Sequence, residues 1–411
     1  MNNIYGVDID PQAVEVTKLS LLLKVLEGEN QDTLERQMKL FKERALPDLA
    51  SNIKCGNSLI GPDFYQGKQL NLLEPEEIYR INPFDWEKEF PQIMKRGGFD
   101  AVIGNPPYIR IQTMKEWAPS EVEIYKEKYI SASKGNYDIY VFFVERGLSL
   151  LNKFGRLGFI LPHKFFNAQY GQPLRTILAK GKHVADVVHF GDLQVFTGAT
   201  NYTCLLFLNK AGKKQCHFVK VADLTAWRLN GESMEGKIPA TKITSSEWNF
   251  TVGKGVELFE KLSKMPVKLG DMAKRIAQGI RTSANEVYVL DLVSENGKLI
   301  VAHSKQLDQD VKLERKTVSL FLQGREIKPY QIQPSGKVVI IPYQVENGHS
   351  KLIVEKAMRE EYPKTFAYLL ENKTYFENRV RGRMRGPNWY AYIYPKNIEI
   401  MKTSKILVPD M

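Results

Sequence analysis

The first half of the chain alternates short apolar runs with longer amphipathic or charged segments, and this alternation constrains the fold more than any other feature. The apolar runs predict strands whose carboxyl ends lie at five positions: Asp8, Cys55, Gly104, Leu161 and Phe190. Segments with helical periodicity lie between several of these runs, and a last apolar run ends at Leu208. Strands that alternate with helices predict an α/β fold built on a doubly wound, largely parallel sheet.

The third of these strands ends in a rigid turn. The stretch from Phe99 to Arg110 has the sequence FDAVIGNPPYIR, in which a buried strand is followed at once by Asn105, two prolines and Tyr108. Each proline fixes its backbone φ near about −65° and removes an N–H donor, and Pro106 also keeps Asn105 out of the helical region. The turn is therefore stiff before any ligand binds.

This turn combines three groups that suit a planar amino group. An amide side chain, a carbonyl group and an aromatic ring lie together at the carboxyl end of a strand, where open α/β sheets bind ligands. Such a site can accept both N–H bonds of an exocyclic NH2 and stack on the ring that carries it. Adenine N6 is a poor nucleophile because its lone pair is delocalised, and accepting both hydrogen bonds makes it more electron-rich without a general base. Taken alone, the tetrapeptide is also compatible with an ordinary Asn-Pro turn.

The first strand carries a second candidate site. A short apolar run from Ile4 to Val7 ends at Asp8, and Asp10 then supplies a helix N-cap with Pro11 at the first helical position. An acidic residue between a strand and a helix is how nucleotide-binding α/β folds hold ribose hydroxyls. Asp8 is therefore a candidate ribose ligand, although a solvated acid before a turn fits the pattern equally well.

Composition bounds the partners and the compartment. The 58 Lys and Arg against 47 Asp and Glu residues give a formal charge of +11, which favours a polyanionic partner, either nucleic acid or an acidic membrane surface. Three cysteines without paired spacing predict neither a disulfide framework nor a zinc site and fit a reducing cytosol. No apolar run reaches the ~18–20 residues of a membrane span, and the N-terminus lacks the features of a signal peptide. We therefore expect a cytoplasmic protein with no metal site and no membrane association.

The pattern changes after about Asn209, where Gly, Lys, Ser and Thr become frequent and periodicity weakens. We place a domain boundary between Glu235 and Trp248, which gives a catalytic domain at 1–235 and a mixed α+β domain at 248–411. Basic residues in the second domain interleave with aromatic and amide residues, a composition that suits DNA binding. The candidate DNA contacts are Arg281, Arg325, Lys328, Arg379, Arg381, Arg383 and Arg385.

The last four of these arginines alternate along the sequence. In an extended segment, residues two apart share one face, so the four guanidinium groups would form a stripe along a phosphate backbone. Their forked geometry also suits guanine edges in the major groove. A solvated flexible loop explains the same run if nothing else indicates DNA.

These motifs resemble those of a known family. FDAVIGNPPYIR is similar to the catalytic motif of the gamma-class DNA adenine-N6 methyltransferases, especially the TaqI-like enzymes and the type IIG restriction-modification enzymes that fuse nuclease, methyltransferase and target recognition. The resemblance implies a Rossmann-like methyltransferase sheet, S-adenosyl-L-methionine as cofactor, double-stranded DNA as partner, and a catalytic segment made of Asn105, Pro106, Pro107 and Tyr108. FLQGREIKPY and the stretch from Trp389 onward resemble the recognition domain of the same enzymes, cut within that domain at the C-terminus.

The resemblance also assigns cofactor and base contacts. IYGVDIDP is similar to the family's second motif, which implies Asp8 on the ribose of the cofactor and Ile9 against its adenine. IKCGNSL resembles the third motif, with Asn57 where an Asp is usual and Ser58 beside it. The segment QVFTG resembles the eighth motif and implies that Phe196 stacks on a flipped target adenine, opposite Tyr108.

One expected part of the family pattern is absent. Upstream of the acidic motif, the family carries a strand and a Gly-rich loop that wraps the methionine part of the cofactor, and this sequence has neither. If the family fold applies, the sheet lacks its central first strand and the cofactor pocket is incomplete. We therefore expect either a fragment of a larger enzyme, with a nuclease domain N-terminal to it, or a second chain that supplies the missing part. In either case the chain alone is expected to bind S-adenosylmethionine weakly or not at all.

Two rival functions stay open beside site-specific DNA adenine-N6 methylation. Protein glutamine N-methyltransferases use a similar NPPY segment to accept hydrogen bonds from an amide NH2, but they would not need a large basic second domain. A catalytically incomplete DNA-binding fragment is the rival from another class, because the cofactor loop is missing. The basic second domain favours DNA over a protein substrate.

Overall fold

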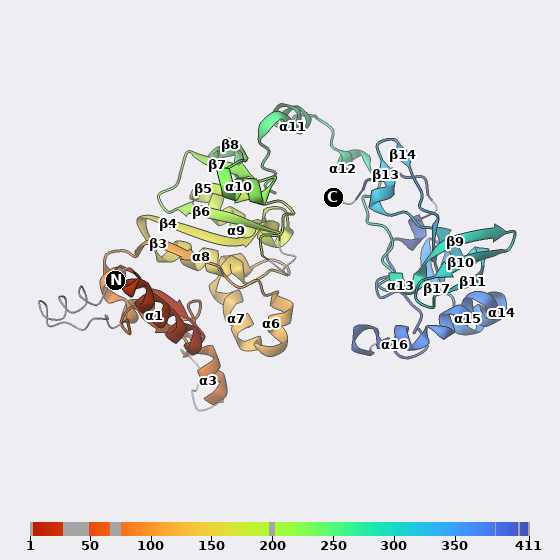
Figure 1. The fold of residues 1–411 in the computed structure, drawn as a ribbon, viewed down its shortest axis with the longest axis horizontal. Helices are drawn as coiled ribbons and strands as arrows, with labels where there is room; N and C mark the ends of the chain where they lie inside the picture. Colours follow the sequence, from red (N-terminus) through yellow and green to blue (C-terminus); the bar gives the residue numbers. More distant parts are fainter. Residues whose placement is uncertain are drawn as a thin grey trace, which may run out of the picture. The chain divides into compact units, whose positions relative to one another are not determined.

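The computed structural model describes residues 3–27, 49–65, 75–196, 202–382, 384–401 and 403–409. The chain divides into two compact units, Met1–Met265 and Pro266–Met411 (Figure 1). The charged segment 32–45, whose sequence predicts a second helix after Pro11–Leu26, lies outside the described residues. Within the described ranges, no helix is long and apolar enough to cross a membrane, and no cluster of His, Cys, Asp or Glu side chains could hold a metal ion.

The main sheet of the first unit has six strands in the order β3-β4-β6-β5-β7-β8. Four strands run in one direction, whereas β6 and β8 are antiparallel to their neighbours. The sheet is therefore largely parallel, as predicted, and β6 and β8 are its two antiparallel strands. The strands are β3 (Phe99–Gly104), β4 (Leu151–Pro162), β5 (Val184–His189), β6 (Thr203–Asn209), β7 (Gln215–Lys220) and β8 (Met234–Pro239).

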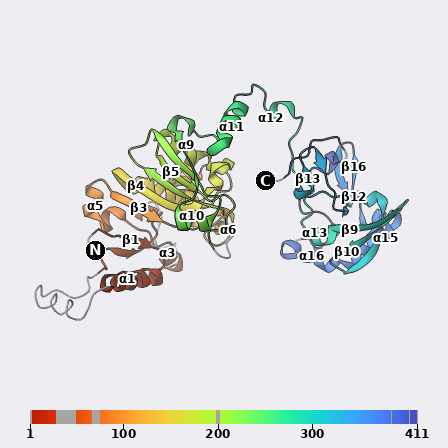
Figure 2. The same ribbon diagram turned by 45° about the horizontal axis from the view of Figure 1, so that its top comes forward.

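Two further strands form a separate parallel pair, β1 (Gly6–Asp8) and β2 (Ile53–Cys55). Helix α1 (Pro11–Leu26) follows β1, and the Asp10 carboxylate accepts the Gln12 backbone N–H at 2.8 Å, which satisfies a free donor of the first turn. The predicted strand, acidic tip and proline-initiated helix are confirmed. Figure 2 shows β1 below β3. Tyr5 precedes β1 and Phe99 opens β3, and the centroids of their rings lie 6.0 Å apart.

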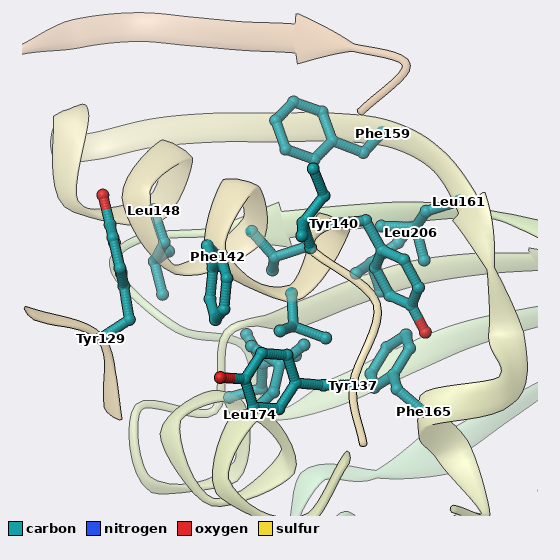
Figure 3. Close-up of a cluster of buried hydrophobic side chains, with 14 of the residues drawn as sticks. Tyr129, Tyr137, Tyr140, Phe142, Leu148, Phe159, Leu161, Phe165, Leu174 and Leu206 are labelled. Atoms are coloured by element: carbon teal, nitrogen blue, oxygen red, sulfur yellow. The ribbon is translucent and has the colours of Figure 1, made fainter. Parts of the chain in front are cut away.

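A helical layer covers one face of the main sheet. Helix α8 (Tyr140–Leu150) is buried there, as its apolar sequence predicts, and Tyr140 and Phe142 are fully inaccessible (Figure 3). The Tyr140 and Tyr170 hydroxyls lie 3.0 Å apart, so each buried hydroxyl has a partner. Helices α6 (Ile111–Trp117), α7 (Pro119–Lys128) and α9 (Gln172–Lys180) contribute to the same core, whereas α10 (Leu224–Asn230) packs in a separate cluster, with Trp227 against Phe190.

The stretch 62–91, whose proline-containing sequence predicts an irregular insertion between strands, is partly helical. It contains a 3-10 turn (Pro62–Tyr65), α3 (Pro75–Ile81) and α4 (Trp86–Glu89), and α5 (Pro91–Lys95) begins at its end. Pro62, Pro75 and Pro91 each open a helical segment, because the first position of a helix needs no N–H donor. Asp85 adds a side-chain cap on Lys88 N at 3.1 Å.

The division between the units lies later than the predicted boundary at Glu235 to Trp248. Strand β8 pairs with β7, and Trp248 is buried in the core of the first unit. The Trp248 backbone N–H donates to the Phe166 carbonyl at 2.9 Å, and Arg175 donates to the Ser245 carbonyl at 3.0 Å. These contacts hold the polar segment after β8 in the first unit, which ends at Met265. The first unit also includes α11 (Val256–Ser263).

The second unit has its own core around a five-stranded antiparallel sheet of order β11-β10-β9-β15-β12. Its strands are β9 (Val289–Asn296), β10 (Leu299–Ser304), β11 (Gln309–Glu314), β12 (Val318–Leu320) and β15 (Lys337–Ile340). Two hairpins flank it, β13 (Ile327–Lys328) with β14 (Gln331–Ile332) and β16 (Tyr343–Glu346) with β17 (His349–Leu352). The helices are α12 (Leu269–Met272), α13 (Asn285–Tyr288), α14 (Glu355–Glu361), α15 (Pro363–Glu371) and α16 (Lys373–Gly382). The predicted mixed α+β architecture is confirmed.

Candidate active site

The Asn-Pro-Pro-Tyr turn follows β3 at the carboxyl edge of the main sheet. The parallel pairing of β3 with β4 sets Gly104, the last residue before the turn, opposite Phe159. Pro106 is buried and Tyr108 is half-buried, whereas Asn105 and Pro107 are exposed. The turn is therefore anchored through Pro106 and Tyr108 and leaves the Asn105 amide accessible to a ligand.

The Tyr108 hydroxyl lies within hydrogen-bond distance of two acceptors. They are Asn105 Oδ1 at 2.9 Å and the Ile160 carbonyl at 3.1 Å, and the single hydroxyl proton can serve one of them at a time. Burial, with a smaller contribution from Cys204, raises the pKa of Tyr108 to about 12, so the hydroxyl stays protonated at neutral pH. Asn105 Oδ1 has two lone pairs and keeps acceptor capacity when Tyr108 donates to it.

The predicted cofactor residues lie together at the carboxyl ends of β1 and β2. The register sets Asp8 opposite Cys55, and the Gly56 N–H donates to the Asp8 carbonyl at 2.8 Å. The Asp8 carboxylate is exposed and accepts the Asp10 N–H at 2.9 Å, which fixes its direction. Ile9 is 50% exposed beside it. This arrangement offers an acid and an adjacent apolar surface to solvent.

Asn57 and Ser58 occupy the turn that follows β2. Asn57 is buried, and its Oδ1 accepts the backbone N–H groups of Leu59 at 3.1 Å and Ile60 at 3.3 Å. The Asn57 oxygen therefore shapes the turn itself. Ser58 is half-buried, and its carbonyl accepts Trp86 Nε1 at 3.1 Å. Both residues thus have structural contacts, and their contact with a cofactor stays a prediction.

Several strand ends meet at the edge that carries Asn105. Strands β3, β4 and β5 run in the same direction, so the residues that follow β4 and β5 lie at this edge too. Phe196 lies in the segment after β5, with 37% of its surface exposed. Among the described residues, which leave out 197–201, the rings of Phe196 and Tyr108 do not form an aromatic pair. Stacking of a base between these two rings therefore stays a prediction.

Two histidines at this edge were not predicted from the sequence. His163 begins the 3-10 turn after β4 (His163–Phe166), His189 ends β5, and their ring centroids lie 4.1 Å apart. Each stands at the carboxyl end of a predicted strand in an α/β chain, the position at which such folds place ligand-binding groups. That position is the sequence signal that could have identified them.

The basic residues predicted to contact DNA have different environments in the second unit. Arg281, Arg325 and Lys328 are exposed, as is Arg385. Arg281 also forms an isolated antiparallel bridge with Tyr394 through its backbone, which leaves its side chain available. These four residues can meet a polyanion, and their contact with DNA stays a prediction.

The predicted stripe of four arginines is wrong. Arg379 and Arg381 belong to α16, in which residues two apart do not share a face. Arg379 is only 9% exposed: Nη2 donates to the Trp389 and Ala391 carbonyls at 2.8 and 2.9 Å, and Nε donates to the Phe376 carbonyl at 3.1 Å. Arg379 is therefore a core residue. Arg383 and the Arg381 side chain lie outside the described part of the chain.

The family of the first unit follows from comparison with known proteins. Residues 2–196 match the family model of the Eco57I restriction-modification methylase. The chain is 31% identical over 407 residues to the type II restriction enzyme and methyltransferase RM.Eco57I of Escherichia coli, a match that covers 95% of this chain. Residues 2–196 form an Eco57I restriction-modification methylase domain.

Other relatives extend the match beyond this methylase domain. The type II methyltransferase M.PaeR7I of Pseudomonas aeruginosa is 25% identical over 329 residues, or 77% of this chain. The solved structure of the type IIL restriction-modification enzyme MmeI with DNA aligns with a TM-score of 0.42 and 11% identity, over 72% of this chain and 34% of MmeI. The chain spans 38% of the length of RM.Eco57I and 53% of M.PaeR7I. The chain thus matches only part of each relative's length.

Proposed function

We propose that this chain is the methyltransferase and target-recognition part of a type IIG restriction-modification enzyme, and that it methylates adenine N6 in double-stranded DNA. One observation carries the proposal: the exposed Asn105 side chain lies on a proline-stiffened turn at the carboxyl edge of the sheet of a methylase domain. Two acceptors, Asn105 Oδ1 and the Pro106 carbonyl, follow each other on this turn. A planar NH2 group with two donors matches them.

The chemistry proposed for this turn needs no acidic or basic side chain. The two acceptors bind the N6 hydrogens, which draws the nitrogen lone pair out of conjugation with the ring and toward an electrophile. The Tyr108 ring supplies a face on which an extruded base can stack. S-adenosylmethionine, when bound, supplies an electrophilic methyl group: the N6–C bond forms as the C–S bond breaks, and N6 then releases a proton to solvent.

The described residues fit the nucleoside half of that cofactor. The exposed carboxylate of Asp8 can accept hydrogen bonds from two ribose hydroxyls, and the exposed Ile9 side chain can pack on adenine. These groups stand at a strand end directly before α1, whose N-cap Asp10 holds the Asp8 carboxylate in place.

The sheet supports the view that a further strand completes the pocket for the methionine half. β1 and β2 pair only with each other, while β3 is an edge strand of the main sheet within the described residues. Ile103 on β3 is 86% exposed, and Ala101 and Gly104 are exposed too, although their sequence is that of a buried strand. We propose that a segment of the same or a second polypeptide, carrying the Gly-rich motif and a nuclease domain, adds a strand between β1 and β3. The completed enzyme denotes this chain together with that segment.

This view predicts a large difference in cofactor affinity. The chain alone is expected to bind S-adenosylmethionine at least about 100-fold more weakly than the completed enzyme, since about 2.7 kcal/mol of contacts to the methionine half would be missing. Isothermal calorimetry on both samples measures the difference. Asp8→Ala is the control and should weaken binding by the completed enzyme. Tight binding by the unmodified chain alone would contradict the proposed strand.

DNA is preferred as the substrate because the second unit is a separate basic module. Arg281, Arg325, Lys328 and Arg385 are exposed there, and the whole chain carries a formal charge of +11. A methyltransferase for glutamine side chains would need no such module. Binding through phosphates should weaken steeply with salt.

Transfer of labelled methyl groups distinguishes the three functions. The completed enzyme is incubated with unmethylated duplex DNA or with a glutamine peptide, and products are digested and resolved for N6-methyladenine. Label in adenine supports the proposal, and label in the peptide supports the protein-methylating rival. DNA binding without methyl transfer to either substrate would support the third function, DNA binding without catalysis.

A further inference from the structure

The two histidines at the carboxyl edge hold one residue, Gly191, between them. The Gly191 N–H donates to His189 Nδ1 at 3.0 Å, and His163 Nε2 lies 3.2 Å from the Gly191 carbonyl oxygen. The two rings are tilted by 37° with centroids 4.1 Å apart. One residue of the loop after β5 is therefore bonded through both of its backbone groups.

These contacts assign the proton on each ring. His189 Nδ1 accepts, so it is unprotonated and the ring proton is on Nε2. His163 Nε2 faces a carbonyl oxygen, which can only accept, so this nitrogen carries the proton and donates. Each ring thus makes its contact in the neutral state. A proton added to His189 Nδ1 would remove the acceptor for the Gly191 N–H.

Gly191 begins the segment that leads to Phe196. Gly191 has a φ of +58°, a left-handed conformation that redirects the chain after β5. The Leu193 N–H then donates to the Phe190 carbonyl at 3.0 Å, and Leu193 and Val195 pack against the buried Phe190. Phe196 follows with its ring partly in solvent. The position of Gly191 therefore sets where this segment starts along the edge.

We propose that His163 and His189 are positioning residues, which hold the backbone N–H and C=O of Gly191 so that the segment Gly191–Phe196 keeps a single course along the edge that carries Asn105. This inference rests on the proposed function, in which an aromatic side chain of that segment stacks on the target base. The histidines touch neither base nor cofactor in this scheme. They act only through the backbone that they hold.

Amide side chains provide matched variants for this pair. Asn places an oxygen where His has Nδ1, and Gln places an NH2 where His has Nε2, so His189→Asn and His163→Gln keep the acceptor and the donor. His189→Leu and His163→Leu keep the bulk and remove the hydrogen bond. The amide variants and the leucine variants will differ only if the role of the histidines depends on their hydrogen bonds to Gly191.

We call the two hydrogen bonds of His163 and His189 to Gly191 the histidine clamp. Hydrogen exchange of the chain tests this clamp directly. In each leucine variant, the amides from Gly191 to Phe196 are expected to exchange about five- to tenfold faster, the effect of losing one hydrogen bond. The amide variants should stay within about twofold of the parent. Equal exchange in all four variants, with folding unchanged, would overturn the proposal.

Methyl transfer by the completed enzyme is the second measurement. We expect kcat to fall about tenfold in the leucine variants with an unchanged KM for S-adenosylmethionine, and to recover in the amide variants. Faster exchange with an unchanged kcat would overturn the positioning role. An inactive parent enzyme would instead count against the proposed function. The exchange measurement would still show whether the histidines hold Gly191 through their hydrogen bonds.

The clamp also predicts a pH dependence of stability. Burial, followed by the neighbouring His163 and Lys220, lowers the pKa of His189 to about 4, and burial lowers the pKa of His163. Cys204 on β6 faces His189 as well and is neutral in its buried position. The unfolded chain takes up these protons at higher pH than the folded chain does, so stability falls as pH drops from about 6.5 toward 4. Thermal unfolding between pH 7 and pH 5 should show a smaller decrease for His189→Asn, and an equal decrease would contradict the assignment.

Discussion

Replacing Asn105 with alanine is expected to lower methyl transfer by the completed enzyme roughly 10²- to 10³-fold, the usual effect of deleting one preorganised group at a reacting atom. The variant loses the Oδ1 acceptor, so the target nitrogen keeps its lone pair in conjugation. Affinity for duplex DNA should change by less than about twofold, because one neutral contact among many phosphate contacts is lost. Transfer of labelled methyl groups and fluorescence anisotropy of labelled DNA measure the two effects.

The control for this prediction is Asn105→Asp, which keeps an oxygen at the same position. It should retain more transfer than Asn105→Ala, because both the N6 hydrogen and the Tyr108 hydroxyl, 2.9 Å away in the parent, still find an acceptor. An alanine variant with full activity would remove Asn105 from the chemistry. Equal loss in both variants would point instead to the Asn105 NH2 group as the part that matters.

Local rules in the sequence were sufficient for the strands and turns around the site. Two prolines after an apolar run fix a turn at a strand end, and Asp10-Pro11 starts α1 in the same way. These features depend on residues that are neighbours in sequence.

Features that depend on distant contacts could not be predicted in this way. The polar segment after β8 has the composition of a linker, yet Trp248 packs in the core of the first unit. The division between the units therefore lies after Met265. The histidine pair joins residues that follow different strands, so only the strand order brings them together. Alternating arginines gave a similar error, because α16 and the carbonyls of Trp389 and Ala391 decide where Arg379 points.

Arg379→Ala is expected to lower the free energy of unfolding of the second unit by about 2–4 kcal/mol, because buried carbonyls lose their charged donor and a cavity is left behind. The parent guanidinium satisfies three backbone carbonyls and lies 4.7 Å from the Phe376 ring centroid. Alanine would leave those carbonyls without their donor and open a cavity beside Trp389. Denaturant titration followed by hydrogen exchange of the amides in α16 measures the loss.

Arg385→Ala is the matched variant that separates stability from DNA binding. Arg385 is exposed, so its removal should change the unfolding free energy by less than about 0.5 kcal/mol. If it contacts a phosphate, the slope of log affinity against log salt should fall by about one unit, uniformly across DNA sequences. Arg379→Ala should instead reduce DNA binding only in proportion to the fraction of the second unit that is unfolded. An Arg379 variant that stays fully folded but loses a phosphate contact would return this residue to the DNA surface and contradict its place in the core.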